Sequence, residues 1–234
     1  KEAAIKAIHD NITHYPPVPG FPELRKAICE KLKRDNNLDF QPGQIIVSSG
    51  AKHSLVNAIL TLVNPGDEVI VPAPYWVSYK EMIKLARGKA VFIPTTEASD
   101  FKVTPAQLEA AITPKSRVLL YSSPCNPTGS VYSREELRGL AEVIERYPNL
   151  YVVSDEIYEF INFESHHEST FRSKAYFAQS LESFFKRVIQ GVFDGHDATS
   201  GPVIFLVFTS PQITLLVIDC QAFFIGFNIS NNLV

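Results

Sequence analysis

The sequence predicts an α/β fold with a mainly parallel sheet covered by helices. Short apolar runs typical of buried strands alternate with segments whose apolar residues recur at helical spacing. Polar motifs also follow directly after two of the strand-like runs, at the positions where open α/β sheets bind ligands. The 234 residues are 45% hydrophobic and 20% charged, so the chain can bury a sizeable core. We therefore expect one domain spanning residues 1–234.

Composition and spacing define the elements in order. Residues 1–11 form an amphipathic charged segment that starts inside a helical pattern, as expected of a fragment. Residues 14–20 contain three prolines and cannot be helical, whereas residues 21–33 place their apolar side chains on one helix face. A strand at 45–47 then enters a Ser-Ser-Gly loop, and residues 53–63 resume helical spacing. The later strands are predicted at 68–72, 90–94, 117–121 and 150–153, and the later helices at 105–112 and 134–147.

The net charge indicates which kind of partner to expect, and the cysteines indicate the cellular compartment. The formal net charge of −3 gives no reason to expect a nucleic acid or an anionic membrane, and favours small-molecule chemistry. Cys29, Cys125 and Cys220 lack paired spacing, which indicates a reduced compartment. No signal peptide is visible and no metal is predicted. We expect a cytoplasmic protein, or an organellar one if a transit peptide has been removed.

The last 47 residues differ from the rest of the chain. All 22 lysines and arginines lie within residues 1–187, although three aspartates occur later. Polar residues interrupt the apolar runs of this tail, and each run is too short to span a bilayer. Buried strands or helices are therefore expected at residues 203–208, 213–218 and 222–227.

Two motifs at the ends of neighbouring predicted strands point to a cofactor. Residues 123–129, Ser-Pro-Cys-Asn-Pro-Thr-Gly, supply the Asn126 amide, and residues 154–158, Ser-Asp-Glu-Ile-Tyr, supply the Asp155 carboxylate and the Tyr158 phenol. A buried carboxylate favours the protonated ring nitrogen that lets pyridoxal phosphate withdraw electrons. Asn126 and Tyr158 can donate hydrogen bonds to its phenolate oxygen. Either motif alone is more often a turn or a helix cap, but the pairing favours pyridoxal phosphate.

Two further features suit the same cofactor. Gly50, Ala51 and Lys52 lie between a strand and a helix, where small residues and the free amides of a helix N-terminus can hold a phosphate. Such loops are also common in α/β units that bind no phosphate. Trp76, the only tryptophan, follows a strand and can stack on a planar ring, although a single tryptophan is more often packed in a core.

Together these segments resemble the class I aminotransferases of fold type I, particularly the bacterial-type aspartate and aspartate/prephenate enzymes. The resemblance extends from about residue 15 to residue 158. It includes Tyr-Pro-Pro-Val-Pro-Gly-Phe-Pro-Glu-Leu-Arg, Pro-Gly-Asp-Glu-Val-Ile-Val-Pro-Ala-Pro-Tyr-Trp-Val-Ser-Tyr, Asn-Pro-Thr-Gly-Ser-Val-Tyr and Ser-Asp-Glu-Ile-Tyr-Glu. It implies a three-layer large domain that binds pyridoxal phosphate, with the C-terminal small domain missing.

The resemblance also implies site roles. The phosphate would be held by Gly50, Ala51 and Lys52, the pyridine ring by Trp76 and Asp155, the phenolate oxygen by Asn126 and Tyr158, and the phosphate of a neighbouring subunit by Tyr15. A homodimer with shared active sites is therefore expected. Lys52, Trp76 and Asn126 are also expected to contact substrate. A lysine at position 52 is typical of the subgroup that recognises the distal carboxylate of aspartate or glutamate, but a solvated lysine at a helix start is equally compatible.

The sequence departs from the family after about residue 170. Lys174 lies in a Ser-Lys-Ala-Tyr run like that of the Schiff-base lysine, but only 19 residues after Asp155 and without the usual continuation. The family's spacing instead points to Asp194, 39 residues after Asp155, which cannot form a Schiff base. Three interpretations stay open: residues 171–234 are altered by a frameshift or by misassigned residues, the chain is a fragment or inactive homologue that keeps the fold, or Lys174 is a relocated Schiff-base lysine.

The sequence thus predicts an aminotransferase that uses pyridoxal phosphate. Its substrates would be an acidic amino acid, of the aspartate or glutamate type, and a 2-oxo acid. One alternative is a pyridoxal-phosphate C–S lyase or synthase on the same fold, because such enzymes use the same Asp, Tyr and Asn set. The other alternative is a catalytically silent chain that keeps the fold.

Overall fold

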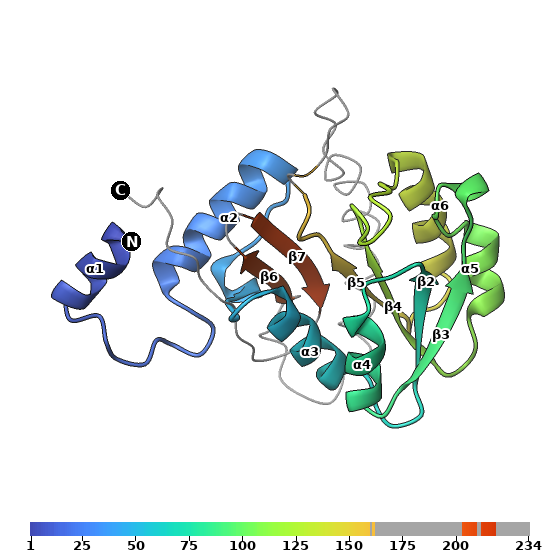
Figure 1. Ribbon diagram of the computed structural model, residues 1–234, viewed down its shortest axis with the longest axis horizontal. Helices are drawn as coiled ribbons and strands as arrows, with labels where there is room; N and C mark the ends of the chain where they lie inside the picture. Colours follow the sequence, from blue (N-terminus) through green and yellow to red (C-terminus); the bar gives the residue numbers. More distant parts are fainter. Residues whose placement is uncertain (160, 162–202, 210–211, 219–234) are drawn as a thin grey trace.

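The chain forms a parallel four-stranded sheet and a mixed three-stranded sheet that lie side by side (Figure 1). The computed structural model describes residues 1–159, 161, 203–209 and 212–218. Four parallel strands run in the order β3-β2-β4-β5, and three run in the order β1-β6-β7, with β6 parallel to β1 and antiparallel to β7. β5 packs beside β7. The strands are β1 (Ile45–Ile46), β2 (Glu68–Ala73), β3 (Lys89–Pro94), β4 (Ser116–Ser122), β5 (Tyr151–Asp155), β6 (Val203–Thr209) and β7 (Gln212–Ile218).

Helices cover both faces of the four-stranded sheet. The chain crosses the sheet in one direction from β2 to β3 and in the other from β3 to β4, so right-handed crossovers put the intervening helices on opposite faces. Accordingly α3 packs against α4, and α5 packs against α6. The helices are α1 (Glu2–His9), α2 (Pro22–Asn36), α3 (Ala51–Leu62), α4 (Ser78–Leu85), α5 (Pro105–Ala111) and α6 (Arg134–Ile144), with 3₁₀ turns η1 (Pro42–Gln44) and η2 (Glu97–Ser99).

Local sequence explains where α5 and α6 begin. At α5, the Thr104 hydroxyl accepts from the backbone N–H of Gln107, whose side chain accepts in return from the Thr104 N–H. Ser133 and Glu136 form the same reciprocal pair at α6. Each pair satisfies two backbone donors that the first helical turn would leave without partners.

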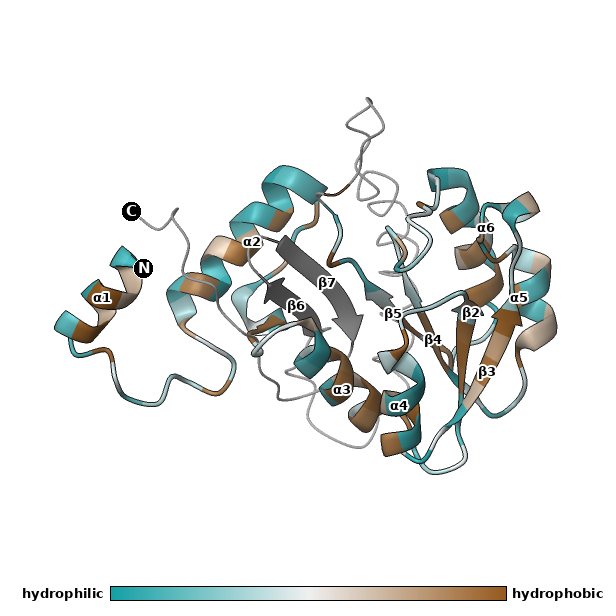
Figure 2. Cartoon of the chain, viewed as in Figure 1, coloured by the Kyte–Doolittle hydropathy of each residue, from teal (hydrophilic) through white to brown (hydrophobic). Residues whose placement is uncertain are grey.

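The core lies between the strands and the helices on each face. Val69, Ile70 and Val71 of β2 are fully buried in succession, as expected of a strand covered on both sides. In Figure 2 the hydrophobic residues of β2, β3 and β4 colour these strands mainly brown, beside helices that mix brown and teal residues. By contrast, α1 has no buried residue and stands apart from the body, joined to it by an extended segment (Figure 1).

That extended segment is anchored where it approaches β1. The Val47 N–H donates to the Pro19 carbonyl at 3.1 Å, and Gly20 adopts a φ of 96°. A Cβ atom at Gly20 would lie 2.5 Å from the Val47 side chain. Only glycine permits both this backbone angle and this close approach.

Most predicted elements are confirmed, with shifted ends. The apolar runs at 203–208 and 213–218, for which the sequence allowed strands or helices, form strands β6 and β7. The run at 222–227 lies outside the described residues. The sequence-based prediction missed α4, an eight-residue helix whose buried side chains are Tyr79, Met82 and Ile83. Among the described residues, no helix has the length and apolar character needed to cross a membrane.

Candidate active site

The two cofactor motifs meet because their strands are neighbours in the sheet. β4 and β5 pair in parallel with Ser122 opposite Asp155, and the Ser123 N–H donates to the Asp155 carbonyl at 3.2 Å. The loops after both strands therefore begin at the same sheet edge. They bring the Asn126 side-chain amide within 3.2 Å of the Tyr158 hydroxyl, to which it donates. The predicted proximity of these two groups is confirmed, and the Tyr158 hydroxyl proton stays available for another acceptor.

Asp155 is a buried carboxylate held by a neutral donor. Its exposed fraction is 4%, and it accepts from the Tyr79 hydroxyl at 2.7 Å and from the Ile157 N–H at 3.4 Å. Burial raises the pKa of Asp155, although the hydrogen bond from Tyr79 opposes that change. Burial and the adjacent carboxylate raise the pKa of Tyr79 well above its usual value, so Tyr79 stays protonated and donates. Among the described residues, no cation pairs with Asp155.

Sequence reasoning missed Tyr79 as a site residue. It lies in the first turn of α4, a helix that was not predicted, three residues after Trp76. Trp76 precedes the helix, but the Tyr79 N–H donates to the Trp76 carbonyl at 3.0 Å, so one turn of backbone joins the two residues. Their three-residue spacing is therefore a signal that sequence reasoning could have used. The rings of Trp76 and Tyr79 meet edge to face, with centroids 5.7 Å apart at 87°.

The predicted loop at the start of α3 contributes the third part of the site. Gly50 caps the helix with a φ of 96°, and no side chain caps this N-terminus, so its backbone amides and positive dipole end remain available to an anion. Ala51 is buried, while Lys52 is exposed and places its Nζ 5.1 Å from the centroid of the Trp76 ring. The loop is further fixed by a 2.6 Å hydrogen bond between the hydroxyls of Ser48 and Ser54.

The remaining predicted site residues lie elsewhere. Tyr15 is in the extended segment after α1, and its side chain is fully exposed. Lys174 and Asp194 lie outside the described residues. The structure therefore pairs Asn126 with Tyr158, and it links Asp155 through Tyr79 to Trp76 and Lys52.

Residues 1–185 match the protein family described as aminotransferase class I and II. The chain belongs to this family. Its relatives include the aspartate/prephenate aminotransferase of Nitrosomonas europaea, which is 51% identical over 161 residues, covering 69% of this chain and 41% of the relative. The chain thus spans about two fifths of the length of that relative.

Solved structures of the family have the same fold. The aspartate aminotransferase of Rhizobium meliloti matches with a TM-score of 0.76 and 35% identity, over 93% of this chain and 51% of that one. The Thermus thermophilus aspartate aminotransferase with maleate matches with a TM-score of 0.72 and 34% identity, over 93% of this chain and 52% of that one. The fold-type I architecture expected from the sequence is therefore confirmed.

The site residues fit the pyridoxal phosphate that aminotransferases of this family use. A buried carboxylate is unfavourable without a cation or strong hydrogen-bond donors, and a protonated pyridine supplies a cation. The Tyr158 hydroxyl and the Asn126 amide can bind a phenolate, and the uncapped α3 N-terminus can bind a phosphate.

Proposed function

We propose that this chain is the cofactor-binding part of an aminotransferase that uses pyridoxal phosphate to move an amino group between an acidic amino acid and a 2-oxo acid. The observation that carries the proposal is Asp155, a buried carboxylate at a strand end with no cationic partner among the described residues. The family relationship, with relatives that are aspartate and aspartate/prephenate aminotransferases, supports the reaction class.

Each residue has a defined task in this proposal. When bound, pyridoxal phosphate supplies an electron sink for bond breaking at the substrate Cα. Asp155 keeps a proton on the pyridine nitrogen, and Tyr79 keeps Asp155 ionised and oriented. Asn126 and Tyr158 stabilise the negative charge on the phenolate oxygen. The amides of Ala51 and Lys52 bind the phosphate, and Gly50, whose own N–H donates to the Ser48 carbonyl at 3.0 Å, forms the turn before them. The Trp76 ring covers the pyridine.

Lys52 is the residue we assign to substrate selection. Lys52 is exposed, and its ammonium lies 5.1 Å from the centroid of the Trp76 ring. A cation there favours a substrate with a second carboxylate. The Thermus relative was solved with maleate, a dicarboxylate, which supports the same choice. Trp76 and Asn126 would border the same substrate.

A change at Asp155 tests the cofactor assignment. We expect Asp155→Asn to weaken pyridoxal phosphate binding at least about tenfold, because the amide cannot neutralise the pyridinium. The same change removes a buried charge, so the cofactor-free protein should keep its free energy of unfolding at neutral pH or gain slightly. Equilibrium dialysis and chemical denaturation measure the two quantities. Asp39→Asn, at an exposed carboxylate paired with Lys33, is the control.

These two readouts separate a site role from a structural one. Loss of stability together with affinity would indicate that Asp155 only supports the fold. Equal affinity in the Asp155→Asn variant and the unaltered chain would rule out the proposed cofactor site.

The source of the catalytic amine has its own test. Lys174 is the candidate Schiff-base residue, since Asp194 carries no amine. If Lys174 is a relocated Schiff-base lysine, borohydride reduction of the protein loaded with pyridoxal phosphate fixes a pyridoxyl group on the peptide that contains Lys174. Absence of any pyridoxyl-lysine peptide would mean that this chain binds the cofactor without joining it covalently and is not catalytic by itself.

A further inference from the structure

The loop between β4 and α6 carries Asn126 and is closed by hydrogen bonds between its own residues. The Cys125 N–H donates to the Ser130 carbonyl at 3.0 Å, and the Gly129 N–H donates to the Cys125 carbonyl at 2.7 Å. Pro127 and Gly129 at the loop tip are exposed. The Asn126 amide donates directly to Tyr158, and the far end of the loop, residues 130–133, sets where the loop places Asn126 against that phenol.

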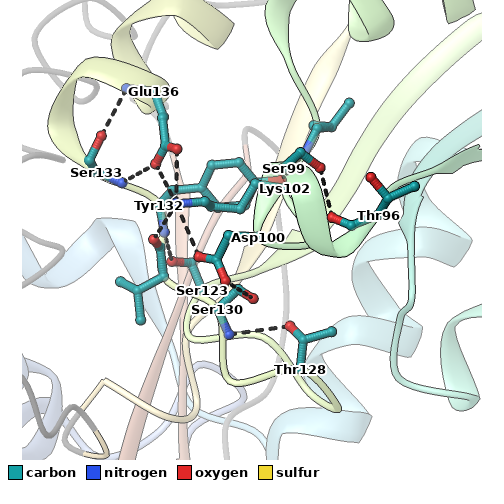
Figure 3. A network of polar contacts seen from close by, with 12 residues as sticks. Thr96, Ser99, Asp100, Lys102, Ser123, Thr128, Ser130, Tyr132, Ser133 and Glu136 are labelled. Atoms are coloured by element: carbon teal, nitrogen blue, oxygen red, sulfur yellow. Dashed lines mark hydrogen bonds and ion pairs between the residues drawn. The ribbon is translucent and has the colours of Figure 1, made fainter.

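Lys102 fixes that far end. Its Nζ lies 2.8 Å from a carboxylate oxygen of Glu136, 3.2 Å from one of Asp100 and 3.4 Å from the Val131 carbonyl. The other Asp100 oxygen accepts from the Ser130 hydroxyl at 3.3 Å. Figure 3 shows these groups converging beside Tyr132. One ammonium thus joins the segment after β3, the Asn126 loop and the first turn of α6.

Tyr132 adds two further hydrogen bonds that hold residues 130–133 beside Lys102. The Tyr132 N–H donates to the Ser123 hydroxyl at 3.2 Å, and the Tyr132 hydroxyl accepts from the Val103 N–H at 2.9 Å. Ser123 and Tyr132 are both buried. Movement of the Lys102 centre would therefore be transmitted to both ends of the loop.

The charge of Lys102 is maintained inside this network. Its side chain is 15% exposed. Burial lowers its pKa, but the hydrogen bonds to Glu136 and Asp100 outweigh burial and raise the pKa above the ordinary lysine value. For Glu136, burial raises the pKa, and the bonds from Lys102 and the Ser133 N–H outweigh it and lower the pKa. Both groups stay charged at neutral pH, so the network is an ionic one.

We propose that Lys102 is a positioning residue for the cofactor's phenolate oxygen, acting through the loop that presents Asn126. The proposal rests on the function proposed above. Among the described residues, Lys102 bonds to Asp100, Val131 and Glu136 but to neither Asn126 nor Tyr158, so its effect must pass through Asp100, Ser130 and Val131. It is a different lysine from those that the family resemblance links to the cofactor.

The test combines substitutions at Lys102 and Asn126 and measures cofactor binding and the proton loss of the bound cofactor. Lys102→Met keeps the length of the stem and removes the ammonium. We expect pyridoxal phosphate to bind about tenfold more weakly, because the Asn126 amide would no longer be held in place to donate to the phenolate oxygen. For the same reason the phenol of the bound cofactor should lose its proton at a higher pH. In an Asn126→Ala background, Lys102→Met should change both quantities by less than about twofold, because the effect passes through Asn126. Lys84→Met, at an exposed lysine, is the control.

A milder variant covers the case in which Lys102→Met does not fold. Ser130→Ala removes only the hydroxyl that binds Asp100, and should weaken cofactor binding about twofold to fivefold in the unaltered background and not in the Asn126→Ala background. Dissociation constants come from equilibrium dialysis, and the proton loss comes from the absorbance of the bound cofactor across pH.

The outcomes separate the two proposals. Suppose that the unaltered chain binds pyridoxal phosphate and that Lys102→Met binds it equally well. This result would overturn the role of Lys102 and leave the proposed function standing. If Lys102→Met is unfolded, equal binding by Ser130→Ala would have the same meaning. Additive effects of Lys102→Met and Asn126→Ala would also overturn the role of Lys102, because they would indicate a general structural role. No binding of pyridoxal phosphate by the unaltered chain would overturn the proposed function, and the role of Lys102 with it.

Discussion

Asp155 combines two opposed electrostatic demands. Burial raises its pKa, while pairing with a protonated pyridine requires the ionised form. Because the pKa of Asp155 is raised in the folded state, protonation of Asp155 stabilises the cofactor-free protein at low pH. This stabilisation is complete below the unfolded aspartate pKa of about 3.9 and is lost as pH rises through the folded-state pKa of Asp155. Binding of pyridoxal phosphate should have the opposite dependence, weakening as pH falls through the pKa of Asp155.

Tyr79 is the residue that makes an ionised Asp155 tolerable. In a Tyr79→Phe variant the carboxylate loses its 2.7 Å donor, so we expect the free energy of unfolding at neutral pH to fall by about 1–3 kcal/mol. The pKa of Asp155 should rise further, which shifts the loss of cofactor binding to higher pH. Denaturation and binding measured across pH check both effects. Tyr75→Phe is the control, since that ring stacks on Phe92 at 4.7 Å; an equal response in the two variants would contradict the role of Tyr79.

At the scale of elements, a buried ion pair joins α2 to the segment after β5. Both carboxylate oxygens of Glu159 accept from Lys31, at 2.8 and 2.9 Å, and one also accepts from Asn36 at 2.8 Å. The side chains of Lys31 and Glu159 are 8% and 4% exposed. Glu159 directly follows Tyr158, so the pair fixes the segment that carries this phenol.

Removing one partner of this pair should be costly. We expect Lys31→Met to lower the free energy of unfolding by about 3–5 kcal/mol, because Glu159 is left buried without its cation. Adding Glu159→Gln should restore part of the loss, since the second change removes the unpaired charge. Lys26→Met disrupts only an exposed pair, at 3.9 Å, and should cost less than about 1 kcal/mol. Similar losses for Lys31→Met and Lys26→Met in denaturation experiments would refute this account.

At the scale of the whole molecule, the N-terminal arm leaves apolar side chains uncovered. Ile5, Ile8, Ile12 and Val18 are exposed and Tyr15 is fully exposed, while the body has a continuous core. An apolar helix face without a partner is unfavourable in water. The family resemblance implies that Tyr15 reaches the phosphate of a neighbouring subunit. We therefore propose that a second copy of the chain covers this arm.

The proposed dimer gives a concentration-dependent prediction. An Ile5→Ser, Ile8→Ser double variant should dissociate at concentrations where the unaltered chain is dimeric, because it removes two apolar contacts worth about 1.5–3 kcal/mol each when fully buried. Sedimentation velocity at several concentrations measures the change. Leu85→Ser, at another exposed apolar side chain, should leave the assembly unchanged. A monomeric unaltered chain at every concentration would exclude the dimer.

Most elements, and the sheet edge where the site lies, are predictable from local sequence patterns. Strands β2, β4 and β5 were predictable because their apolar runs are local and the turn residues that bound them are local too. Asn126, Asp155 and Tyr158 were predictable as neighbours because parallel strands end at the same edge. Helix α4 was missed, since it is only eight residues long and follows directly on the loop after β2.

The groups that hold the site residues in place are not predictable from local patterns and come together in the folded chain. Tyr79 meets Asp155 across 76 positions, Lys31 meets Glu159 across 128, and Lys102 meets Glu136 across 34. No local pattern encodes such pairs, because they depend on strand order and on which face each crossover helix covers. The chemistry of the site is therefore readable from short motifs, whereas the pKa of Asp155 and the orientation of Asn126 and Tyr158 depend on side chains that only the folded sheet brings together.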